Sequence, residues 1–204
     1  MTTVLKTIEQ LDNVAKIPAL RSVVHTSLSR TIGAIRQSIR DNEPDGEAMK
    51  NARSFYNLYH YALTELLKLT TNKWDMPLDV YQMVAFMQKE NPMPDEVATA
   101  IATASGVPVE QIKELNAVQV EKDREALERD APKIIEVFTK LTPTKTKGVQ
   151  TVSIDVEQQL TEKVISSLVK AKGQTMNRVI RTRKLEDLAN LATYDKAIEQ
   201  LQAQ

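Results

Sequence analysis

The chain has 204 residues, and its 27 lysines and arginines are balanced by 27 aspartates and glutamates, so its formal net charge is zero. This length suits one large domain or two small ones, and the neutral sum excludes a protein that is basic over its whole surface. Cysteine is absent, which excludes disulfides, thiolate metal sites and cysteine nucleophiles. Only two histidines occur.

Apolar residues at helical spacing dominate the first part of the chain. A short helix is predicted at the N-terminus, and Pro18, which lacks an amide proton, predicts its end. A second helix is then expected over residues 18–40. Residues 41–47, DNEPDGE, have the proline and glycine of a loop. The apolar spacing that follows predicts a third helix over residues 47–69.

Shorter elements are predicted in the middle of the chain. A loop over residues 70–77 leads to a helix that begins near Pro77. Two short helices follow over residues 97–105 and 109–116, and a charged helix is expected over residues 118–130. These elements continue the helical pattern of the first part.

The last third of the chain changes in character. Residues 141–148, LTPTKTKG, have no periodicity and predict a linker or mobile loop, whereas the alternating residues 149–156 predict the only strand. Two closing helices are expected over residues 157–172 and 175–202, divided at Gly173 because glycine weakens a helix.

The expected fold class is mainly α: a multi-helix bundle with at most one short strand or hairpin and an extended C-terminal helical arm. The predicted parts are a helical body over residues 1–140, the linker over 141–148 and a basic arm over 149–204, although all three can form one continuous domain. An isolated helix cannot bury the broad apolar stripe of the last helix, so we expect a homo-oligomer or packing on the body.

Several classes of function lack the residues they need. The sequence has no glycine-rich phosphate loop and no serine triad motif. His25 and His60 have no metal-ligand partner three or four residues further on, and we interpret them as packing or surface histidines. We expect no cofactor, no metal and no enzymatic activity. Neither a signal peptide nor an apolar run of about 20 residues is visible, which predicts a cytoplasmic protein without a membrane partner.

The neutral sum conceals a division of charge along the chain. Residues 13–40 carry five basic and no acidic side chains, and residues 138–184 carry ten basic and three acidic ones. Residues 90–136 carry eleven acidic and five basic side chains. A basic segment attracts phosphates and releases their counterions, whereas an acidic one repels polyanions or binds a basic partner. Alternatively, the segments pack beside each other and cancel, or their charges merely solvate helix faces.

The basic run that ends at Lys184 suggests a phosphate-binding surface. Its lysines and arginines are interleaved with Gln174 and Asn177, and both kinds of group bind phosphate oxygens. Exposed aromatic rings are candidates for stacking on bases, although each predicted one can equally be a packing residue. The candidate nucleic-acid-binding residues are Lys163, Lys170, Lys172, Arg178, Arg181, Arg183 and Lys184, with Arg36 and Arg40 as an extension and Tyr61 and Trp74 as stacking residues.

Residues 97–115 resemble the helix–turn–helix signature of DNA-binding proteins, with Ala102, Gly106 and Ile112 at its small, turn and apolar positions. The resemblance implies a recognition helix after Gly106. That helix carries Glu110 and Glu114, and an acidic helix is poorly suited to a groove lined by phosphates. We therefore interpret the segment as a structural helical hairpin.

Together these features predict a non-enzymatic nucleic-acid-binding accessory protein that prefers single-stranded DNA or RNA and acts in replication or transcription. The acidic segment over residues 90–136 would contact a polymerase or another protein. The alternative prediction is a helical scaffold or adaptor that binds only protein partners through its charged faces.

Overall fold

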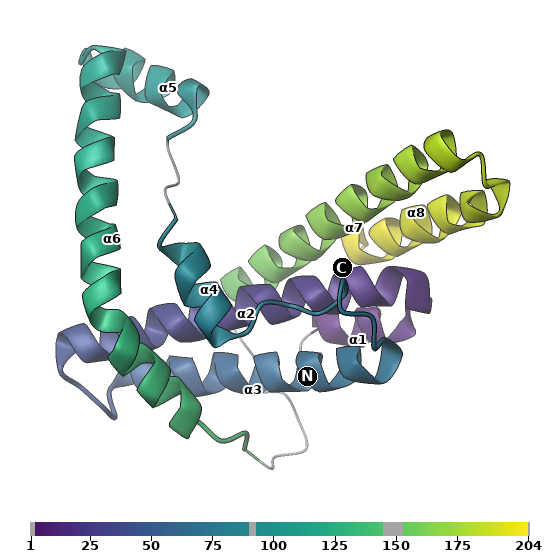
Figure 1. Ribbon diagram of the computed structural model, residues 1–204, viewed down its shortest axis with the longest axis horizontal. Helices are drawn as coiled ribbons and strands as arrows, with labels where there is room; N and C mark the ends of the chain where they lie inside the picture. The colour runs from purple at the N-terminus through teal and green to yellow at the C-terminus, as the bar shows by residue number, and fades with distance from the viewer. Residues whose placement is uncertain (1–2, 90–92, 145–152, 204) are drawn as a thin grey trace. The chain divides into compact units, whose positions relative to one another are not determined.

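The computed structural model describes residues 3–89, 93–144 and 153–203, without the side chain of Ile154. Helices account for the regular structure of these residues, and no strand occurs among them (Figure 1). The predicted mainly α fold is confirmed. The helices are α1 (Thr3–Gln10), α2 (Asn13–Asp41), α3 (Glu47–Leu69), α4 (Val80–Met87), α5 (Asp95–Ser105), α6 (Val109–Lys140), α7 (Ile154–Thr182), the 3-10 helix η1 (Leu185–Asp187) and α8 (Leu188–Gln202).

The chain divides into two compact units. Unit 1 comprises Met1–Leu78 and Leu141–Gln204, and unit 2 comprises Asp79–Lys140. The C-terminal helices α7 and α8 pack on α2 and α1, so they share a core with the N-terminal helices. The predicted boundary over residues 141–148 stays a prediction, because residues 145–148 lie outside the described residues.

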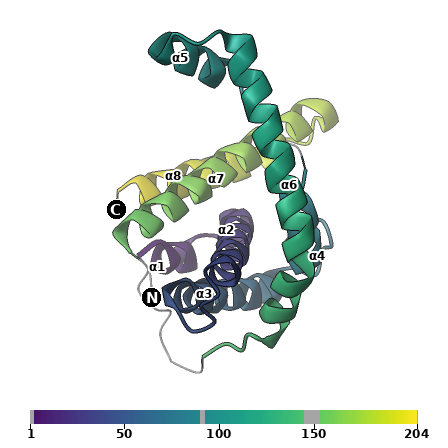
Figure 2. The same ribbon diagram turned by 90° about the vertical axis from the view of Figure 1, so that its left-hand side faces the viewer.

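Unit 1 is built around α2, which packs on α3 and on α7, and α8 packs on α7 in turn (Figure 2). The helices α2 and α7 are antiparallel: Arg30 donates to Gln159, whereas the carbonyl of Pro18 accepts from the Ser167 hydroxyl at 3.1 Å. Burial of each large aliphatic side chain in such a core contributes about 1.5–3 kcal/mol. The fully buried residues include Val4, Leu5, Ile8, Val23, Val24, Leu58, Leu66, Leu160, Val164, Leu168 and Leu201.

The first break between helices falls before Pro18, so the predicted helix start at residue 18 is wrong. The backbone of Asp12 is extended and its carboxylate accepts the Val14 N–H at 3.0 Å, which caps the N-terminus of α2. Pro18 lies within α2, only one and a half turns from its start. The cap fixes where the helix begins, and the single amide hydrogen bond that Pro18 lacks does not end it.

The predicted division at Gly173 is also wrong, because α7 continues through it to Thr182. The helix ends at Arg183, which adopts a left-handed backbone with φ of 57° and donates its N–H to the Val179 carbonyl at 2.7 Å. An interior glycine costs a helix about 1 kcal/mol relative to alanine, which packing can offset. Of the predicted strand over residues 149–156, residues 154–156 are the first turn of α7, and residues 149–152 lie outside the described residues.

Unit 2 contains α4, α5 and α6. The predicted hairpin of residues 97–115 is formed by α5 and the start of α6, which pack together after a turn at Gly106 with φ of 72°. Only glycine adopts this left-handed backbone without a steric penalty. The two helices predicted over residues 109–116 and 118–130 are one continuous helix, α6, which also contains Pro132. Among the helices of the described residues, none is long and apolar enough to cross a membrane.

Candidate anion-binding groove

A groove lies between α2 and α7 in unit 1. It consists of two adjoining hollows of about 400 and 440 Å³, which share Pro18, Arg21, Ala171 and Gln174 as lining residues. We call it the α2–α7 groove. Its charged and polar lining residues are Arg21, Ser22, His25 and Thr26 from α2, Asp75 from the loop before α4, and Lys163, Ser167, Lys170, Gln174, Thr175, Arg178 and Arg181 from α7.

Helical spacing explains how α7 brings its cations together. Lys163, Lys170 and Arg181 are separated by seven and eleven residues, and these intervals return a side chain to nearly the same side of a helix. The buried Val164 and Leu168 belong to the neighbouring core face of the same helix. The cations therefore follow the edge at which α7 meets α2, where the antiparallel α2 adds Arg21.

Four cations of the groove have no acidic partner among the residues that the structure describes. Within the described residues, no ion pair or hydrogen bond to a carboxylate is made by Arg21, Lys163, Lys170 or Arg181, which we call the groove cations. The fifth, Arg178, donates through Nε to the Asp187 carboxylate at 3.0 Å. The groove therefore carries an excess of positive charge that attracts anions.

A single carboxylate, that of Asp75, lines the groove among the described residues. It accepts a hydrogen bond from the Thr70 hydroxyl at 2.8 Å, and the Asp75 N–H donates to the Asn72 carbonyl at 2.9 Å. These bonds fold the loop over residues 70–75 into a turn at one end of the groove. One acidic side chain does not neutralise the groove cations.

His25 lies half-buried in the wall of the groove. Its Nε2 accepts the backbone N–H of Leu78 at 3.1 Å, so a neutral His25 ring carries its proton on Nδ1. Burial, and secondarily the positive charge of Arg21, lower the pKa of His25 below its ordinary value of 6.5. The ring is therefore mainly uncharged at neutral pH and can hold the loop in place.

Several predicted binding residues lie outside the groove. Lys172 pairs with Asp195 of α8, so its charge ties α7 to α8. Arg183 and Lys184 follow the end of α7, beyond the lining residues. Arg36 and Arg40 lie at least 15 residues further along α2 than Arg21, which is about 22 Å of helix. The structure thus does not bring these five residues together with the groove cations.

The two predicted stacking residues differ in their surroundings. Tyr61 is half-buried against the core of unit 1, and its hydroxyl donates to the Glu9 carboxylate. Burial, and then this hydrogen bond, raise the pKa of Tyr61 well above its ordinary value of 10. Trp74 is 76% exposed, with the Lys73 ammonium 5.6 Å from its ring centroid, and it directly precedes the groove residue Asp75. Trp74 lines neither hollow, but it is exposed, whereas Tyr194, the aromatic residue that lines the groove among the described residues, is buried.

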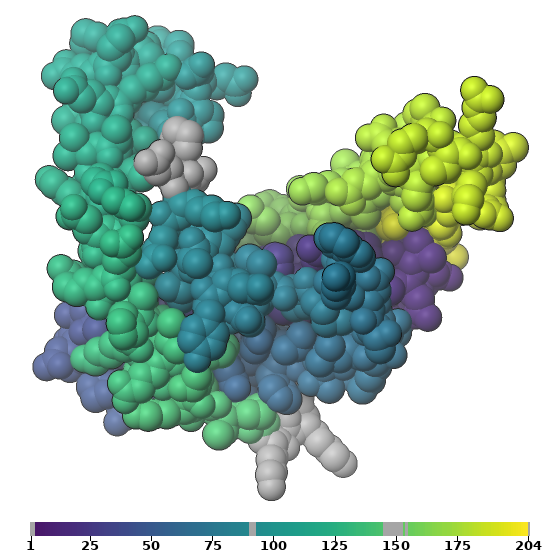
Figure 3. All heavy atoms as spheres, in the orientation of Figure 1, coloured from purple at the N-terminus to yellow at the C-terminus, as the bar shows by residue number. Residues whose placement is uncertain are grey.

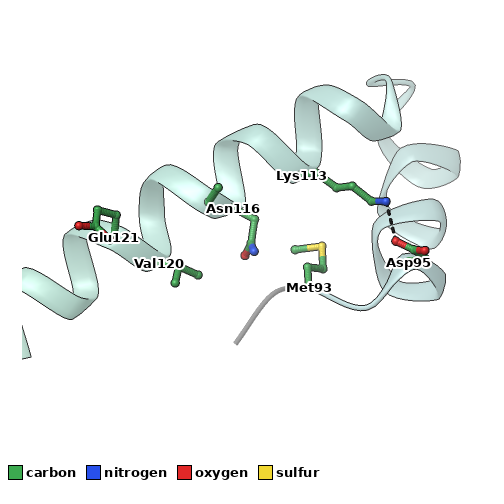
Figure 4. Close-up of a pocket in the computed structure, with 7 residues that line it drawn as sticks. Met93, Asp95, Lys113, Asn116, Val120 and Glu121 are labelled. Atoms are coloured by element: carbon green, nitrogen blue, oxygen red, sulfur yellow. Dashed lines mark hydrogen bonds and ion pairs between the residues drawn. The ribbon is translucent and has the colours of Figure 1, made fainter. Parts of the chain in front are cut away.

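Unit 2 holds a smaller hollow of about 320 Å³ at the junction of α5 and α6 (Figure 4). Met93 and Val120 give it an apolar wall, and Lys113 donates to the Asp95 carboxylate at 2.5 Å across its edge. This ion pair lowers the pKa of Asp95. Because its lysine is already paired, the hollow lacks the surplus of positive charge that distinguishes the α2–α7 groove.

Sequence reasoning identified the α7 side of the groove but missed Arg21 and His25 as its α2 side. Arg21 was recognisable only as one of five cations in residues 13–40, and His25 was interpreted as a packing or surface histidine. Their spacing of four residues places them on one side of α2, although the sequence does not show that α7 packs there.

Together, fold and groove define a mainly α protein with a basic groove between two helices. Comparison of the chain with protein-family models, curated proteins and solved structures gave no match.

Proposed function

We propose that the protein is a non-enzymatic nucleic-acid-binding accessory protein that holds a single strand along the α2–α7 groove. The observation that carries this proposal is the set of groove cations, which share one groove and have no carboxylate partner among the described residues. Lysine and arginine side chains in this arrangement bind successive phosphates and release counterions. The neutral amide of Gln174, which lines both hollows, adds a hydrogen-bond donor for phosphate oxygens.

The length of the groove limits the strand that it can hold. Lys163 and Arg181 are 18 residues apart on α7, which corresponds to about 27 Å of helix. At the rise of about 3.4 Å per nucleotide of a duplex strand, this length matches about eight nucleotides, and a more extended single strand places fewer in it. That size agrees with single-strand sites of roughly 4–16 nucleotides in other proteins.

Trp74 supplies the second element of a single-strand site. Its ring is exposed, Trp74 directly precedes the groove residue Asp75 in the chain, and an aromatic ring stacks on any base because every base has a π face. Such stacking favours a strand whose bases are unpaired. The preference for a single strand over a duplex therefore rests on Trp74, whereas attraction to either polyanion rests on the groove cations.

The alternative is a helical scaffold that binds only protein partners. It is supported by exposed apolar side chains on α5, α6 and α7, outside the groove. In that case the groove cations would bind an acidic surface of a protein partner. The two proposals differ in whether nucleic acid binds at all.

A binding titration separates them. Fluorescence anisotropy is measured with a labelled oligo-dT and with a hairpin duplex of the same length, over a series of salt concentrations. We expect tighter binding to oligo-dT, with a log–log salt slope of about −3, because four neutralised phosphates each contribute about 0.7. The absence of binding to both probes at low salt would overturn the nucleic-acid proposal and leave the scaffold.

A further inference from the structure

The outer side of α7 carries a second surface, distinct from the groove. Val169, Met176 and Ile180 are large apolar residues that are exposed by 54%, 44% and 71%. Their spacing of seven and four residues places them in one stripe, about a third of a turn around α7 from the buried Val164 and Leu168. We call these three residues the α7 stripe. The end of the α7–α8 hairpin stands clear of α1 to α3 within unit 1 (Figure 3).

Positive charge borders the α7 stripe. Arg183 and Lys184 follow its last residue, Ile180, and within the described residues neither forms an ion pair. The sequence from residue 163 to residue 185 contains no acidic side chain. Because Lys172 and Arg178 are paired with Asp195 and Asp187, the positive charge beside the stripe is that of Arg183 and Lys184. A partner that covers it needs apolar side chains and negative charge.

The helix α6 in unit 2 offers a surface with those properties. Leu115 and Val118 are exposed by 62% and 50%, and three residues separate them on one side of the helix. Glu114 lies one turn before Val118 on the same side of the helix, and Glu110 lies one turn before Glu114. Within the described residues, neither glutamate forms an ion pair. The nearest cation along the helix, Lys113, is already paired with Asp95. We call Glu110, Glu114, Leu115 and Val118 the α6 face.

We propose that the α7 stripe of one copy binds the α6 face of a second copy. Each chain carries one surface of each kind, apolar in both cases and opposite in charge, and the charges of the whole chain balance at 27 against 27. A symmetric contact between two α7 stripes would instead bring two basic surfaces together. Because the two surfaces differ, the contact either forms twice in a closed two-fold dimer or repeats head-to-tail in a ring or open chain.

Two charge-introducing variants test this proposal independently of the groove. Ile180→Glu places an acid in the basic surface, and Leu115→Lys places a base in the acidic one. Both positions are exposed and outside the groove, so the fold is expected to survive, as circular dichroism can verify. Leu67→Glu on α3, at a site 51% exposed and outside both surfaces, is the matched control.

The mass of nuclease-treated protein is measured by sedimentation velocity over a concentration series. The wild type and the Leu67→Glu control should form dimers or larger assemblies, whereas the Ile180→Glu and Leu115→Lys variants alone should remain at the monomer mass of 22.9 kDa. Their equimolar mixture should form a dimer and stop there, because only one intact surface of each kind remains.

Three results would overturn the proposal. One is a wild-type chain that stays monomeric up to about 100 μM, where a contact with a Kd of tens of μM is populated. Another is a mixture that stays monomeric. A third is a Leu115→Lys variant that dimerises by itself, which would indicate a symmetric contact through α7. None of these results depends on whether nucleic acid binds the groove.

Discussion

The Nε2 atom of His25 accepts the backbone N–H of Leu78 at 3.1 Å, and this bond ties the wall of the groove to the loop that carries Trp74. Leu78 is the last residue of unit 1 before the chain enters unit 2. The same loop places Asp75 at the end of the groove. One side-chain acceptor on α2 therefore helps to position Trp74 and Asp75, the one acidic lining residue of the candidate site within the described part of the chain.

Protonation of His25 should destabilise the protein, because it removes the acceptor and charges a half-buried ring near Arg21. The folded state lowers the pKa of His25 below the ordinary value of 6.5, so the unfolded state binds more protons as the pH falls. The stabilisation is present above pH 6.5 and is lost as the pH falls through the folded-state pKa. We expect a lower urea midpoint at about pH 5.5 than at about pH 7.5.

The variant His25→Gln should lose this pH dependence, since glutamine does not titrate. The exposed His60 provides the matched control, and His60→Gln should keep the wild-type dependence. If the two variants behave alike, or if only the His60 variant loses the dependence, the assignment to His25 is wrong.

Replacement of Arg183 by glycine should stabilise unit 1. Arg183 has a left-handed backbone with φ of 57° at the end of α7, which costs a residue with a Cβ about 1 kcal/mol and costs glycine almost nothing. We expect the free energy of unfolding to rise by about 0.5–1 kcal/mol. Thr182→Gly, at the last helical residue, is the control and should lower it. Equal effects of both changes would contradict this account of the helix end.

Trp74→Ala should weaken single-strand binding without changing the fold. A stacked base contributes about 1–3 kcal/mol, which corresponds to a loss of about 5- to 150-fold in affinity. The salt slope should stay the same because no phosphate contact is removed. Tyr81→Ala, which removes an exposed aromatic ring of α4, is the matched control and should bind as the wild type does. If the Trp74 variant binds oligo-dT with unchanged affinity, Trp74 is not part of the nucleic-acid site.

Much of the fold was predictable because the apolar periodicity of the helices is strong. The bounds of α3, Glu47–Leu69, agree with the prediction, since Gly46 precedes the apolar stripe and no proline interrupts it. The errors at Pro18 and Gly173 have a common origin. Both residues lower helix propensity, but capping and packing decided where the helices end, and single-residue propensity is weaker than either.

The site was predictable in part for the same reason. Lys163, Lys170 and Arg181 share one side of a helix only if α7 is continuous, and the predicted division at Gly173 hid this relationship. Arg21 depends on the antiparallel packing of α2 on α7, which links residues about 150 positions apart in the chain. Local patterns do not encode such a contact.

The most direct test of the groove is the salt dependence of oligo-dT binding by the double variant Lys170→Ala/Arg181→Ala. Its control is Lys50→Ala, which removes an exposed lysine of α3 outside the groove. We expect the log–log slope of the double variant to become shallower by about 1.4, because two phosphate contacts of about 0.7 each are lost. The control should keep the wild-type slope. Equal slopes for the double variant and the wild type would contradict the assignment of the nucleic-acid site to the α2–α7 groove.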